Sequence, residues 1–106
     1  MIYQGKARYP VTHLVYHTTD TPLSWMAGKS TEDKVAEIRR WHVEERKWRD
    51  IGYHWVIDRD GTILPGRAET VVGAGVEGFN RGVIHVVLVG GRGGKAYDNI
   101  EKNYTC

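Results

Sequence analysis

The run VIHVVLVGG, from Val83 to Gly91, is the feature that most restricts how this chain can fold. It is almost continuously apolar, a pattern typical of a central strand that is covered on both faces. Such a strand needs neighbours in a sheet and a layer of other elements on each side. The chain has 106 residues, and we expect residues 1–106 to form a single domain of this kind.

Two other segments predict strands. VTHLVYH (Val11–His17) is rich in β-branched and aromatic residues, and alternation places His13, Val15 and His17 on one face. IGYHWVID (Ile51–Asp58) predicts a second strand, which an Arg-Asp-Gly turn connects to TILP as a hairpin.

The segment between these strands predicts one long helix. Ser30 is the expected N-cap, and the acidic Asp33 follows in the first turn, where the helix dipole favours it. Apolar residues at a spacing of three to four continue to about Trp48. If the helix reaches that far, Glu45 would pair with Arg49.

These elements predict an α/β domain with a mixed central β-sheet and one long helix packed on it. The sequence offers a single convincing helix, although the Val83–Val89 strand calls for cover on both faces. The predicted elements therefore cover only one face of the sheet, and the layer on its other face is missing.

Composition excludes several classes of protein. The net charge of +2 gives no argument for nucleic-acid binding. No apolar run approaches the roughly 18 residues that a membrane span needs, and MIYQGKARYP lacks the apolar core of a signal peptide. We therefore expect synthesis in the cytoplasm without membrane insertion. The single cysteine, Cys106, excludes an internal disulfide.

The five histidines suggest acid–base or metal chemistry, although no H-E-x-x-H or C-x-x-C motif is present. His13 and His17 cannot share one ion from a regular strand, because their Cα atoms would be about 13 Å apart at roughly 3.3 Å per residue. Tyr53 and His54 are adjacent, so a strand would direct them to opposite faces. At most one of them can share a site with His17.

Other polar patterns have simpler interpretations. Asp58 with Asp60, and Glu44 with Glu45, suggest the paired carboxylates of a glycosidase, but nothing in the sequence raises either pKa by burial. GGRGG, which begins at Gly90, matches no phosphate-binding pattern and is interpreted as a flexible loop.

Several stretches together resemble one known family. LVYHTTDTP, WHVEERKWRDIGYHWVIDRDGTILPGR, GAGVEGFN and VVLVGG occur in the order found in the zinc-dependent N-acetylmuramoyl-L-alanine amidases. That family includes the amidase-type phage lysozymes and the peptidoglycan-recognition proteins. The resemblance extends over roughly Val11 to Gly91, and its long W-H-x(5)-W-x-x-I-G-Y-H run is specific.

The resemblance implies a peptidoglycan hydrolase that uses Zn²⁺. Its members cleave the amide between N-acetylmuramic acid and L-alanine of the stem peptide. We accordingly expect a monomer that acts on the cell wall after release, as an endolysin does. His17 corresponds to the first zinc ligand, Tyr53 to the tyrosine over the metal-bound water, and His54 to a structural residue that points away.

The chain also departs from the family pattern. The family's second histidine, lysine and third ligand lie beyond a further helix, whereas this sequence stops at Cys106, which comes too early to be that ligand. The covering C-terminal helix of the family is therefore expected to be absent. The family often has histidine at Gly75 and a small residue at His85. His85 could substitute as a ligand, but we favour a buried, hydrogen-bonded strand histidine.

Two alternatives from other classes remain. A non-catalytic module could keep the peptidoglycan groove without the zinc. A small interaction protein could bind another protein through the face that the absent helix leaves bare. The sequence does not decide whether this form is active, which residues complete the zinc site, or which stem peptide is preferred.

Overall fold

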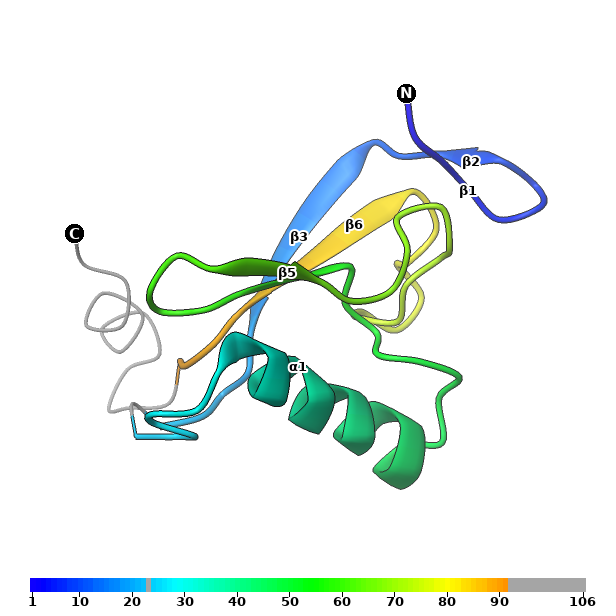
Figure 1. Ribbon diagram of the computed structural model, residues 1–106. Helices are drawn as coiled ribbons and strands as arrows, with labels where there is room; N and C mark the ends of the chain where they lie inside the picture. Colours follow the sequence, from blue (N-terminus) through cyan, green and yellow to red (C-terminus); the bar gives the residue numbers. More distant parts are fainter. Residues whose placement is uncertain (23, 92–106) are drawn as a thin grey trace.

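The computed structural model describes residues 1–22 and 24–91. Its elements are β1 (Tyr3–Gln4), β2 (Tyr9–Pro10), β3 (His13–Thr18), α1 (Thr31–Arg40), the π-helical turn η1 (Trp41–Glu45), β4 (Trp55–Ile57), β5 (Ile63–Pro65) and β6 (Val83–Leu88). The main sheet has the order β3-β6-β4-β5 (Figure 1). β6 is parallel to both β3 and β4, whereas β4 and β5 are antiparallel. The mixed sheet with one long helix on it confirms the predicted fold class.

β6 is the central strand that its sequence predicts. Its residues from Val83 to Val87 are all buried, and β3 and β4 flank it on either side. α1 lies across one face of the sheet (Figure 1). There Val35 and Ile38 of the helix form a core with Val56 of β4 and Val87 of β6.

The opposite face of the sheet is less well covered. Leu14 and Tyr16 of β3 are 58% and 64% exposed, and Ile63 of β5 is 57% exposed. Among the described residues, no second helix packs on this face. The segment Arg92–Cys106, which contains Cys106 and most of GGRGG, lies outside the described residues.

The helix begins where the sequence predicts. Ser30 is the N-cap, with extended backbone, and its hydroxyl accepts a hydrogen bond of 3.1 Å from the Asp33 amide. This bond satisfies one of the amide groups that lack a partner in the first helical turn.

Replacing Ser30 by alanine should therefore lower the free energy of unfolding by about 1 kcal/mol. Urea unfolding followed by tryptophan fluorescence measures the change. Ser24→Ala, in the exposed loop before the helix, is the matched control and should leave stability nearly unchanged. Equal effects of the two substitutions would contradict the cap.

The predicted end of the helix at Trp48 is wrong. The α-helix ends at Arg40 and widens into η1, where the Arg46 amide donates to the Trp41 carbonyl over 3.1 Å. Lys47 then has a positive φ of 63°, which ends helical geometry. The expected Glu45–Arg49 ion pair is also not formed. A carboxylate oxygen of Glu45 instead lies 3.9 Å from the Arg40 guanidinium.

The second strand is shorter than predicted. The segment Ile51–His54 has irregular backbone before β4. This is because the Gly52 amide donates to the His42 side chain and the Gly52 carbonyl accepts from the Ala74 amide. A small N-terminal hairpin, β1 with β2, was not predicted. It delivers the buried Gln4, whose amide group bonds to the Val83 carbonyl and the Gly82 amide.

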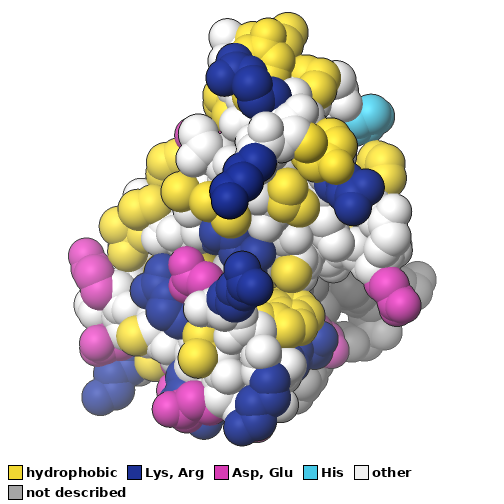
Figure 2. All heavy atoms as spheres, turned by 90° about the vertical axis from the view of Figure 1, so that its right-hand side faces the viewer, with side chains coloured by type: hydrophobic (Ala, Val, Ile, Leu, Met, Phe, Trp, Pro, Cys, Tyr) yellow, Lys and Arg dark blue, Asp and Glu magenta, His cyan; other side chains and the backbone are white. Residues whose placement is uncertain are grey.

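No helix among the described residues combines the length and apolar character that crossing a membrane requires. Figure 2 shows lysine and arginine side chains spread over the face to the right of Figure 1, with acidic side chains among them. This face carries no single basic patch, which agrees with the mild net charge of +2.

Candidate active site

His17 and Tyr53 meet on the sheet face that α1 covers. His17 lies near the carboxyl end of β3, and Tyr53 lies two residues before β4. Their ring centroids are 5.1 Å apart. Two residues that are 36 positions apart in the sequence are thus brought into direct contact by strands that both flank β6.

The two side chains are in different protonation environments. Partial burial lowers the pKa of His17, so its ring is neutral near pH 7. Burial also raises the pKa of Tyr53, although the nearby Arg46 opposes this change. A protonated phenol therefore stands beside a neutral imidazole.

His42 supports Tyr53 from the helix side, a contact that the sequence did not reveal. The π-helical turn directs His42 inward, where its ring packs edge-on against Tyr53 with centroids 5.2 Å apart. Its Nδ1 accepts a hydrogen bond of 2.8 Å from the Gly52 amide. Burial, together with Arg46 and Arg67, lowers the pKa of His42 to about 4, so this acceptor is unprotonated at neutral pH.

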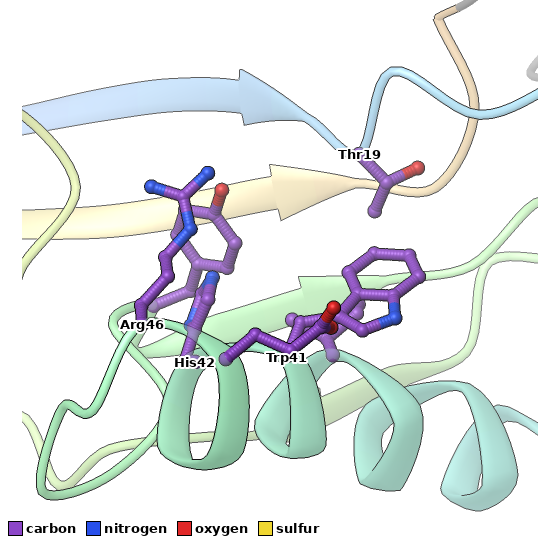
Figure 3. A pocket seen from close by; sticks show the side chains of 7 residues that line it. Thr19, Trp41, His42 and Arg46 are labelled. Atoms are coloured by element: carbon purple, nitrogen blue, oxygen red, sulfur yellow. The ribbon is translucent and has the colours of Figure 1, made fainter.

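A groove opens next to this cluster. It has a volume of about 400 Å³ and is lined by Thr19, Ile38, Trp41, His42, Glu45, Arg46 and Tyr53. Figure 3 shows Thr19, from the loop after β3, facing the Trp41 ring, with Arg46 reaching up from the helix side. An aromatic wall with one acidic and one basic side chain suits a polar ligand that carries both charges.

His85 lies directly behind His17. It is fully buried, and its Nδ1 is 2.9 Å from Nε2 of His17. This geometry agrees with the favoured interpretation of a buried, hydrogen-bonded strand histidine. That its partner would be His17 was not predicted. The contact depends on the parallel pairing of β3 with β6, which sets His85 opposite Val15, and no pattern in the sequence reveals that register.

His54 is held by backbone groups on both ring nitrogens. Nδ1 accepts the His85 amide over 3.0 Å, so the proton must be on Nε2, which donates to the Val71 carbonyl over 2.8 Å. The side chain is fully buried and stacks on His85. Both of its nitrogens are therefore unavailable to a ligand.

The carboxylate pairs of the sequence do not form a glycosidase site. Burial alone would raise the pKa of Asp58, but hydrogen bonds from Lys34 and Thr31 keep it below its ordinary value. Asp60 caps a turn by accepting from the Thr62 amide. Glu44 and Glu45 are exposed near Arg40. None of these carboxyl groups is poised as a general acid.

The described residues fit part of a zinc site. His17 offers a neutral imidazole, and its Nδ1 has no hydrogen-bond partner in the described part of the chain. However, residues 1–22 and 24–91 contain no cluster of three histidine, cysteine or acidic side chains that could hold a metal ion. A catalytic zinc ion needs three protein ligands, so the described residues alone do not complete the site.

Comparison with known proteins places this chain in a family. Residues 7–103 match the Amidase_2 family of N-acetylmuramoyl-L-alanine amidases. The endolysin of Klebsiella phage KP32 is 48% identical over 80 residues, which cover 74% of this chain and 51% of that protein. The chain thus spans about half the length of the curated relatives it matches.

Solved structures agree with this family. The N-acetylmuramoyl-L-alanine amidase LysC from Clostridium intestinale superposes with a TM-score of 0.61 at 31% identity, covering 76% of this chain and 47% of LysC. Peptidoglycan recognition protein LE in complex with tracheal cytotoxin, a monomeric diaminopimelic acid-type peptidoglycan, gives a TM-score of 0.66 at 28% identity, covering 77% and 48%. The sequence match and the shared fold show that this chain belongs to the N-acetylmuramoyl-L-alanine amidase family.

Proposed function

We propose that the chain carries the site of a peptidoglycan hydrolase that cleaves the amide between N-acetylmuramic acid and L-alanine of the stem peptide. The observation that carries the proposal is the contact of His17 with Tyr53 beside the groove, within a domain of the amidase family. In the reaction the oxygen of water bonds to the carbonyl carbon. The carbon–nitrogen bond then breaks, and the released amine takes up a proton.

We assign Tyr53 as the hydrogen-bond donor to the carbonyl oxygen of the substrate amide. An amide carbonyl gains negative charge as water adds, and a fixed donor stabilises that charge in a site that excludes water. Because burial raises the pKa of Tyr53, its hydroxyl stays protonated and can donate. The edge-on packing of His42 restricts the ring and so fixes the direction of this hydroxyl.

Zinc is the proposed cofactor, and His17 is its proposed ligand within the described chain. A bound zinc ion lowers the pKa of its water to about 7 and polarises a carbonyl group. Metal binding requires the neutral form of histidine, which partial burial of His17 favours.

The groove suits a muropeptide. Trp41 offers a flat apolar surface to a sugar or peptide, while Arg46 and Glu45 offer opposite charges to a stem peptide that has carboxyl and amino groups. The complex of the structural relative LE with a monomeric peptidoglycan supports this class of ligand. By analogy with the phage endolysins, we propose that the chain acts as a monomer on the cell wall after release.

The test uses the full chain, purified with zinc present, and a muramoyl peptide whose released L-alanine amine is quantified by mass spectrometry. Tyr53→Phe removes one donor and should lower the rate by about 10²-fold with zinc content unchanged. His17→Ala should lower both zinc content and rate. His13→Ala, an exposed histidine on the same strand, is the control and should leave both near wild type.

One observation favours a second function, a peptidoglycan-binding module without catalysis: a three-ligand cluster is not found among the described residues. The same assay separates the two. Chain that pellets with purified sacculi but releases no amine at any zinc concentration would establish the binding module and reject the hydrolase.

A further inference from the structure

The hydrogen bond between His17 and His85 is shielded from water on two sides. The His54 ring stacks on His85 with an interplanar angle of 10°. On the other side the backbone of Gly75 closes over the contact, since a Cβ built there would lie 2.7 Å from Nε2 of His17 and closer still to Nδ1 of His85. The contact therefore requires glycine at position 75.

The loop that supplies Gly75 is itself held in place. The Asn80 side chain accepts hydrogen bonds of 3.0 Å from the amides of both Gly75 and Val76. These two bonds hold the Gly75 backbone close to the rings of His17 and His85. The sheet and this loop therefore both hold the rings of His17 and His85 in contact.

One proton lies between Nε2 of His17 and Nδ1 of His85, and either nitrogen could carry it. His85 is fully buried without an acidic partner among its described contacts, so its charged form is costly and a neutral ring is expected. If the proton is on His17, both rings adopt the Nε2-protonated form, which is the intrinsically preferred form of neutral histidine, and Nε2 of His85 is then a buried donor without a partner among the described residues. The lone pair of His17 is then on Nδ1, the nitrogen without a hydrogen-bond partner in the described chain.

We propose that His85 is a positioning residue for His17: its Nδ1 accepts the Nε2 proton of His17, which fixes the ring and presents the Nδ1 lone pair of His17 to the site. A histidine that binds a metal through one nitrogen is oriented by the partner of its other nitrogen. The use of that lone pair for zinc rests on the proposed function, whereas the position of the proton is a property of the metal-free protein.

The first test reads the proton directly. Two-bond ¹H–¹⁵N correlation spectra of the ¹⁵N-histidine-labelled, EDTA-treated full chain at pH 8 distinguish protonation at Nε2 from protonation at Nδ1. We expect His17 to be protonated at Nε2. A spectrum with the His17 proton on Nδ1, or with a mixture of both forms, would overturn the proposal whether or not the chain binds zinc.

Two substitutions then test the role of His85. His85→Leu removes the acceptor at similar volume, and His17 should become a mixture of forms, with zinc affinity lowered about 10–100-fold. His85→Asn keeps an oxygen acceptor near the position of Nδ1, and it should retain the single form and most of the affinity. Equal behaviour of the two variants would reject positioning by this hydrogen bond.

The outcomes separate this inference from the proposed function. If wild-type chain binds no zinc but His17 is protonated at Nε2, the zinc assignment fails and the positioning role stands. If His85→Leu does not fold, the wild-type spectrum and His85→Asn still decide the question.

Discussion

Asp58→Asn should lower the free energy of unfolding by about 3–5 kcal/mol, the cost expected when one partner of a buried ion pair is removed. The carboxylate of Asp58 accepts two hydrogen bonds from Lys34, of 3.0 and 2.9 Å. The two side chains are only 4% and 7% exposed. Asp58→Asn would leave the ammonium group of Lys34 buried without its counter-charge.

This pair joins the start of α1 to the hairpin that follows Tyr53. Thr31 at the first position of the helix donates to Asp58 over 2.7 Å, and the Arg59 amide donates over 2.8 Å. These bonds satisfy the remaining oxygen lone pairs, so the carboxylate is well solvated by the protein despite its burial. Loss of the charge therefore affects the contact between helix and sheet as a whole.

Urea unfolding at pH 7, followed by tryptophan fluorescence, measures the loss. Asp60→Asn, two residues away in the exposed turn, keeps an oxygen for the Thr62 amide and should have a far smaller effect. Lys34→Met combined with Asp58→Asn removes both charges and should cost less than the sum of the single changes. Additive effects, or equal effects of Asp58→Asn and Asp60→Asn, would show that the pair is not coupled.

Much of the fold could be predicted because it depends on local patterns. The apolar run at Val83–Leu88 became the central strand, and Ser30 capped the helix as expected. The end of the helix could not be predicted in the same way. The bond between the Gly52 amide and the His42 ring joins the end of the helix to the segment before β4, and no periodicity in the sequence encodes this contact.

The same contrast between local patterns and long-range contacts applies to the site. His17 and Tyr53 were chosen from the family resemblance, and the structure brings their rings together. His42 and His85 complete the surroundings of that pair, but each acts through a neighbour that is distant in sequence. Their roles depend on the turn η1 and on the β3–β6 register, which the sequence alone did not give.

Gly75 and His85 show why single-position comparisons can mislead. The sequence shows two separate departures from the family, a glycine in a loop and a histidine in a strand. In the structure they are one feature, because a side chain at position 75 would occupy the space that the His85 ring fills. The His85 ring in this position therefore requires glycine at position 75.

Buried neutral histidines should make the protein sensitive to acid. Burial, with Arg46 and Arg67, lowers the pKa of His42 to about 4, and burial, with His17, His54 and Arg67, lowers that of His85 to about 4. In the unfolded chain histidine has a pKa of about 6.5. Between pH 6.5 and 4 the unfolded chain therefore binds more protons, and stability falls as the pH is lowered through this window.

The expected loss is on the order of 3 kcal/mol for each of the two histidines by pH 4, since one pKa unit corresponds to about 1.4 kcal/mol. Urea unfolding at pH 7.5, 6.5, 5.5 and 4.5 measures it. His42→Asn keeps an acceptor for the Gly52 amide but cannot titrate, so it should flatten the pH dependence, whereas the exposed control His13→Asn should not. The carboxylate of Asp58 does not interfere, because its stabilising contribution is lost only below a pH of about 4. Parallel pH profiles for wild type and His42→Asn would mean that His42 takes up its proton without unfolding, and burial of its ring would then not be the source of acid sensitivity.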